Sequence, residues 1–146
     1  MKPGIALLAL CLLTPIARAD SLESPDAFEA ALSKCLMTST APAACFEKHL
    51  GAKFPPGNEE LATVVTQVAE FFKQWLAKDK VFAVHPVKTI RLGAYAERRI
   101  YLIEDTTGQI IMFDTSFVRR LGDWHVLKFN LTSKSEGIKA VLGEVL

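Results

Sequence analysis

The side chains most able to do chemistry in this 146-residue chain are one Asp–His pair and a few scattered ions. Asp123 and His125 lie two positions apart, and such a pair acts as a general base when the carboxylate orients the imidazole. No serine, cysteine or metal ligand stands at a spacing that completes the set, so we favour a structural histidine at the end of a strand. The sequence indicates no metal site and no cofactor, and we expect a non-catalytic protein.

Arginines offer a second kind of chemistry. Pairing of two predicted strands places Arg99 opposite Asp114, a cross-strand ion pair worth less than about 1 kcal/mol if exposed. A separate hypothesis gathers several arginines at one end of the sheet, where they would meet an anionic ligand. These are Arg98, Arg99, Arg119 and Arg120.

The N-terminus has the pattern of a secretory signal peptide. Lys2 precedes an apolar run at 5–13, and Ala17-Arg18-Ala19 fits the small-x-small cleavage rule. We expect cleavage after Ala19 and export to the periplasm or the medium. The apolar run is too short to cross roughly 30 Å of hydrocarbon, so we expect no membrane anchor.

Removing residues 1–19 leaves a mature chain, 20–146, that we expect to form a single α+β domain. Of the 17 Lys and Arg residues, Lys2 and Arg18 are lost, so 15 face 16 Asp and Glu residues, a formal net charge of −1. Nucleic-acid binding requires a basic stripe, and this balance argues against such a partner.

Two cysteines remain in the mature chain, Cys35 and Cys45. In an oxidising compartment an even pair most simply forms a disulfide. A metal site would lack further ligands, and a redox site would favour a C-x-x-C spacing. We therefore predict one structural disulfide.

Four helices are indicated by caps and by apolar residues at three- and four-residue steps. The first begins at Ser24-Pro25, the second runs from Pro42 to Leu50, and a long helix of about 20 residues follows Asn58. A short helix follows the capping box that begins at Ser133. The predicted disulfide would join the first two helices into a hairpin.

Alternating patterns predict one strand at 81–92 and three more within 97–132. A turn at Asp105-Thr106-Thr107-Gly108 would set Glu104 opposite Gln109. The next turn is either a two-residue loop, Gly122-Asp123, or a three-residue loop, 121–123. We favour the longer loop because it keeps Phe117 opposite Leu127 on one apolar face.

This register divides the sheet into two faces. One is the expected core face, with Ile100, Leu102, Ile111, Phe113, Phe117, Leu127, Phe129 and Leu131. The other is more apolar than a solvent-facing sheet normally is. It is either a binding surface or is covered by the last helix or by the N-terminal hairpin. Its candidate binding residues are Arg99, Tyr101, Met112, Asp114, Trp124, Val126 and Lys128.

The segment YLIEDTTGQIIMFDTSFVRRLGDWHVLKF and the element order resemble NTF2-like and cystatin-like α+β domains over roughly the last 90 residues. The resemblance implies helices packed on an antiparallel meander. We expect a binding module for a protein, a peptide or a small ligand, with homodimer formation through the open face as another role. The alternative implied by the resemblance is a small enzyme with Asp114 or His125 in a pocket under the long helix.

Overall fold

The computed structural model describes residues 21–55, 57–58 and 60–143, so the predicted signal peptide lies outside the described residues. Three helices precede a four-stranded antiparallel sheet, and a short helix follows it, which confirms the predicted α+β class. The helices are α1 (Pro25–Thr38), α2 (Ala44–Leu50), α3 (Glu60–Leu76) and α4 (Ser135–Gly143), and the strands are β1 (Val81–Leu92), β2 (Ala96–Asp105), β3 (Ile110–Arg120) and β4 (Asp123–Thr132).

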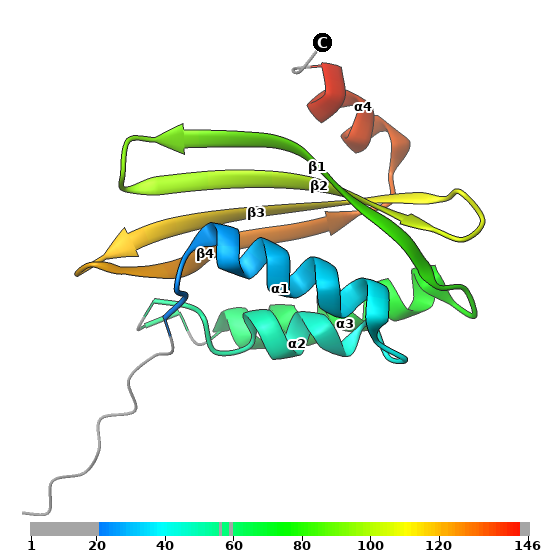
Figure 1. Cartoon of the computed structure of the whole chain (residues 1–146), viewed down its shortest axis with the longest axis horizontal. Helices are drawn as coiled ribbons and strands as arrows, with labels where there is room; N and C mark the ends of the chain where they lie inside the picture. Colours follow the sequence, from blue (N-terminus) through cyan, green and yellow to red (C-terminus); the bar gives the residue numbers. More distant parts are fainter. Residues whose placement is uncertain (1–20, 56, 59, 144–146) are drawn as a thin grey trace, which may run out of the picture.

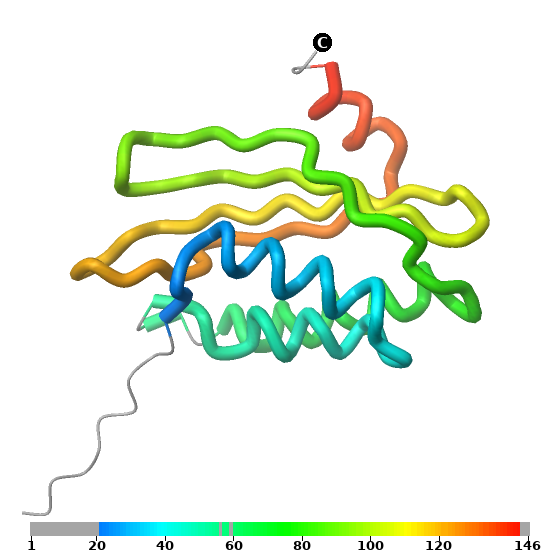
Figure 2. Tube along the Cα trace, in the orientation of Figure 1, coloured from blue at the N-terminus to red at the C-terminus, as the bar shows by residue number. Residues whose placement is uncertain are grey.

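The sheet is a simple meander in the order β1-β2-β3-β4, which the tube in Figure 2 follows from end to end. Helices α1, α2 and α3 lie together on one side of it, while α4 stands apart from them (Figure 1). We call the opposite side of the sheet the far face. No residue of α4 is buried. Within the described residues, no helix combines the length and the hydrophobicity needed to cross a membrane.

Local sequence sets the start of α1. The Ser24 hydroxyl accepts a hydrogen bond from the Ala27 N–H at 3.0 Å, and Pro25 occupies the first helical turn, where its missing N–H costs nothing. The helix then buries Phe28, Leu32 and Leu36, which share one face. Capping and periodicity together therefore orient α1 towards the sheet.

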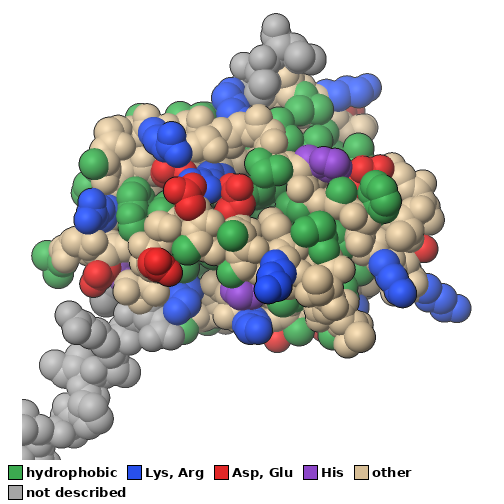
Figure 3. Space-filling view, viewed as in Figure 1, with side chains coloured by type: hydrophobic (Ala, Val, Ile, Leu, Met, Phe, Trp, Pro, Cys, Tyr) green, Lys and Arg blue, Asp and Glu red, His purple; other side chains and the backbone are tan. Residues whose placement is uncertain are grey.

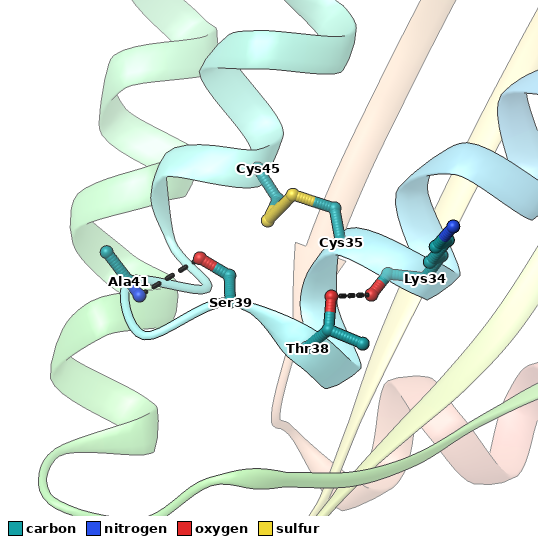
Figure 4. The surroundings of a disulfide bond; sticks show 6 residues. All are labelled: Lys34, Cys35, Thr38, Ser39, Ala41 and Cys45. Carbon is teal, nitrogen blue, oxygen red and sulfur yellow. Dashed lines mark hydrogen bonds between the residues drawn. A yellow bond between two sulfur atoms is a disulfide. The ribbon is translucent and has the colours of Figure 1, made fainter.

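The Cys35–Cys45 disulfide is present and joins α1 to α2, with 5.9 Å between the two Cα atoms. Figure 4 shows the short connection that it spans, where the Ala41 N–H donates to the Ser39 hydroxyl at 3.0 Å. Cys45 is buried in the core. The predicted disulfide is confirmed, and it is consistent with an extracellular or periplasmic protein.

Replacing both cysteines with alanine should lower the free energy of unfolding by roughly 2–3 kcal/mol, because the bond limits the unfolded chain. Urea unfolding of the mature protein measures this loss. The double variant also serves as the control for reduction. A reductant should shift the urea midpoint of the wild type towards that of the double variant, and it should leave the midpoint of the double variant unchanged. Equal midpoints for the oxidised wild type and the double variant would contradict a stabilising role.

The β2–β3 register differs by one residue from the prediction. Asp105 lies opposite Gln109 across a three-residue loop, because its carboxylate accepts the backbone N–H groups of Thr107 and Gln109 at 2.8 and 2.9 Å. Gly108 supplies the positive φ of +83° that such a loop needs. Tyr101 therefore pairs with Phe113, and every side chain of β2 faces the opposite way from the predicted arrangement.

The β3–β4 register is partly as predicted. Phe113 pairs with Leu131 as expected, but the hairpin closes through the two-residue loop Leu121-Gly122, with φ values of +51° and +92°. These angles are typical of a type I′ turn. A register shift after Ser116 then brings Phe117 opposite Val126. The predicted three-residue loop was wrong.

The core lies between the sheet and α1–α3. Its centre is aromatic: Phe46 of α2 packs edge-on against Phe72 of α3 and Phe113 of β3, and Phe28 of α1 packs against Phe117. Several residues predicted for the core face lie elsewhere. Ile100 and Leu102 alternate with the core residues of β2, and Leu127 is exposed. The other five predicted residues are in the core, which also contains Tyr101, Ile103 and Val126.

Candidate functional site

The predicted binding residues do not form one surface. Met112, Asp114 and Lys128 share the far face, as expected, because the β3–β4 register around them was correct. The slip in β2 places Tyr101 in the core, and Val126 is buried there too. The remaining two predicted residues, Arg99 and Trp124, also lie on the helix side, where Arg99 is buried and Trp124 is half-buried against the core.

A hollow of about 310 Å³ opens on the far face. Strand pairing builds it: Ser116 lies between Arg98 of β2 and Lys128 of β4, and Asp114 is paired with Asn130. Paired residues of adjacent strands point to the same face, so their side chains converge. We call this the far-face hollow, and it is lined by Arg98, Asp114, Ser116, Lys128, Phe129 and Asn130.

Arg98 was not among the binding residues predicted for this face, and it lines the far-face hollow from β2. Its Nε and Nη2 donate to the two carboxylate oxygens of Asp114 at 3.0 and 2.6 Å. Such a bidentate pair is rigid as well as charged. Asp114 therefore fixes the guanidinium within the hollow before any ligand arrives. The predicted partner of Asp114 was Arg99, and the one-residue register shift explains the difference.

Three other lining residues keep unused hydrogen-bonding capacity. Within the described residues, the side chains of Ser116, Lys128 and Asn130 form no hydrogen bond or ion pair with the protein. Lys128 adds an exposed positive charge, and Ser116 has no general base bonded to its hydroxyl in the described structure. This set can bind an anion and hydrogen-bond to it.

Arg99 occupies a different site, between β2 and α1. Its side chain is only 4% exposed and is bonded to three carboxylates, those of Asp26, Glu29 and Glu97. The Glu29 contact to Nη1 measures 2.8 Å. Arg91 donates to Glu97 from the surface at 3.1 Å. Figure 3 shows acidic side chains gathered around a basic group on this side of the molecule.

Contacts within this cluster shift the pKa values of Arg99 and Asp26. Burial alone would lower the pKa of Arg99, but the hydrogen bonds that its guanidinium donates to Asp26, Glu97 and Glu29 outweigh burial and raise the pKa. The same guanidinium lowers the pKa of Asp26, first through its hydrogen bond and then through its charge. The ion pairs of Arg99 with Asp26 and Glu29 tie α1 to the sheet.

Tyr101 lies beside the same cluster. Burial raises the pKa of its hydroxyl, and the Glu29 carboxylate raises it further. The hydroxyl is buried and has no hydrogen-bond partner in the described structure. Because a neutral, enclosed phenol offers no route for a ligand, we assign Tyr101 to packing.

The residues considered for catalysis are separated. His125 is buried opposite Val118, and its Nδ1 has no hydrogen-bond partner within the described residues. Asp114 lies on the far face, away from α3. Within the described part of the chain, no three or more His, Cys, Asp or Glu side chains are grouped to hold a metal ion.

No protein-family model matches the chain, and no curated protein or solved structure shows significant similarity to it. These comparisons lend no support to the NTF2-like or cystatin-like resemblance. What the structure supports is the α+β class with its helices N-terminal to an antiparallel sheet.

Proposed function

We propose that this is an exported, disulfide-stabilised binding protein that holds a small anionic molecule in the far-face hollow. The N-terminal pattern and the Cys35–Cys45 bond support export. The periplasm and the medium are both compartments in which such a bond persists.

One observation carries the proposal. A guanidinium fixed by Asp114 and three side chains with unused hydrogen-bonding capacity surround one hollow on the face that α1–α3 leave uncovered. Arg98 and Lys128 supply two positive charges against the single negative charge of Asp114. An anion gains from that excess, while Ser116 and Asn130 can hydrogen-bond to its remaining oxygens.

The size of the hollow favours a small ligand over a protein. About 310 Å³ is at the lower end of the volumes, roughly 300–1,000 Å³, that small-molecule sites occupy. A carboxylate or phosphate ester of few atoms would fill it. A protein partner would need a wider apolar surface around the hollow.

Amide chemical-shift mapping locates the ligand. The mature, ¹⁵N-labelled protein is titrated with succinate and, separately, with inorganic phosphate. We expect saturable shifts clustered at the backbone amides of the far-face hollow residues, with the core amides near Phe46 unchanged. Shifts confined to another surface, or no saturable shift with either anion, would contradict the proposal.

A further inference from the structure

The two hairpin tips at one end of the sheet form a surface that the far-face hollow does not include. The β1–β2 turn contains Tyr95 and the β3–β4 turn contains Leu121, and Figure 1 shows both tips at the same end of the molecule. The Arg119 N–H donates to the Tyr95 carbonyl at 2.7 Å, which holds the two hairpins side by side.

These tips carry exposed apolar side chains. Leu92 is 70% exposed, Tyr95 is 62% exposed, and Leu121 is completely exposed. Leu121 also adopts a φ of +51°, a conformation that asparagine or glycine accepts more readily than leucine. The fold gains no buried contact from this leucine. Leu121 therefore has an unfavourable backbone conformation that no buried contact offsets. Such a residue points to a role other than stabilising the fold.

Arginines surround these apolar groups. Arg91, Arg119 and Arg120 are all exposed, and Arg119 Nε donates to the Gly122 carbonyl within the turn. Two carboxylates oppose them: Asp123 is exposed across the turn from Arg120, and the buried Glu97 accepts from Arg91. The space-filling view shows hydrophobic and basic side chains next to one another at this end (Figure 3). Hairpin tips that combine hydrophobic and basic side chains suit a partner that is negatively charged and partly apolar.

We propose that the two tips dock on the surface of an anionic lipid bilayer. Leu92 and Leu121 would enter the boundary between headgroups and acyl chains, and Tyr95 would lie at headgroup level. Arg119 and Arg120 would pair with lipid phosphates. The geometry favours a bilayer over a protein pocket because the apolar groups sit on two convex tips, which a soft surface accepts together. The far-face hollow lies between the ends of the strands and stays open.

Vesicle sedimentation of the mature protein tests this. We expect binding to phosphatidylcholine vesicles that contain phosphatidylglycerol, and much weaker binding to phosphatidylcholine alone. Leu121→Asn should weaken binding about tenfold by removing a leucine from the bilayer. Arg120→Gln should weaken binding to the anionic vesicles about fivefold and leave binding to neutral ones unchanged.

Three control measurements distinguish a loss of vesicle docking from unfolding and from an effect of the far-face hollow. Asparagine suits a type I′ turn, so Leu121→Asn should raise Tm by about 2–4 °C, and lost binding would not reflect unfolding. Phe82→Asn removes a side chain that is 67% exposed near the opposite end of β1 and should bind vesicles like the wild type. Lys128→Gln changes the far-face hollow and should bind vesicles like the wild type, whether or not the hollow binds an anion.

Four results would overturn the docking proposal. The first is no sedimentation with either vesicle. The second is an equal loss of binding in Phe82→Asn, which would show that any exposed apolar group suffices. The third is competition by millimolar inorganic phosphate that removes all binding, which would assign the arginines to a free anion. Concentration-dependent dimers of the wild type that Leu121→Asn abolishes, without vesicle binding, would also contradict the proposal and assign the tips to a second copy of the chain.

Discussion

Replacing Arg99 with methionine should lower the free energy of unfolding by about 3 kcal/mol, among the largest losses expected from one substitution in this chain. Methionine keeps most of the apolar stem of the side chain, so the lost stability reflects removal of the guanidinium charge. Without the guanidinium, Glu97 stays buried with only the exposed Arg91 as its partner, and Glu29 loses its contact across the α1–β2 boundary. An uncompensated buried charge is far more costly than a missing surface pair.

Urea unfolding of the variant measures this effect, and its neighbour provides the control. Arg98→Met removes an ion pair in which the arginine is partly exposed, and should cost less than about 1 kcal/mol. Adding Glu97→Gln to Arg99→Met should recover part of the stability, because it removes the stranded charge. Equal losses for the two arginine variants would show that the Arg99 cluster does not lock α1 to the sheet.

The same cluster sets a response to acid. Since the pKa of Asp26 is lowered in the folded state, its contribution to stability is present above its ordinary pKa of 3.8 and is lost as the pH falls through the folded value. Arg99→Met removes the cause of that shift. The stability of the variant should therefore fall less steeply than that of the wild type below about pH 4.

Phe46→Ala should destabilise the protein by about 3–5 kcal/mol, the second large effect. The ring is fully buried and packs edge-on against Phe72 and Phe113, with centroid distances of 5.0 and 5.4 Å. It is therefore the point where α2, α3 and β3 meet. Truncation loses the buried area and leaves a cavity that three separate elements cannot close together.

Thermal and urea unfolding compare this variant with Phe71→Ala, which truncates an exposed phenylalanine of α3. The control should change stability by less than about 1 kcal/mol. Phe46→Leu, which keeps most of the volume, should fall between the two. A small loss in Phe46→Ala would place the centre of the core elsewhere.

The helices and the disulfide could be predicted because their determinants are local. Ser24 caps α1 through a contact three residues away, and the two cysteines are only ten residues apart. The sheet register depends on details that the sequence pattern shows less clearly. The Asp105 carboxylate organises its turn, and Leu121 adopts a backbone conformation that its residue type disfavours. Each detail moves the pairing of the strands by one residue.

That one-residue shift accounts for most of the misplaced site residues. Asp114 and Lys128 were placed on the correct face because the β3–β4 register was correct near Phe113. Arg99 and Tyr101 were exchanged with Arg98 and Ile100, since every side chain of a slipped strand changes face. Burial of Arg99 also runs against the usual exposure of arginine. Its carboxylate partners on α1 are about 70 residues away, and the sequence offered no signal that links them.

The central claim, that the far-face hollow binds a small anion, is tested most directly by one charge comparison. Lys128→Glu and Lys34→Glu change the net charge equally, but Lys34 lies on α1, on the other side of the sheet. Isothermal titration with succinate, or with phosphate if that is the anion that binds, should show affinity lowered at least about tenfold in Lys128→Glu and unchanged in Lys34→Glu. Equal affinities in the two variants would contradict the assignment of the site.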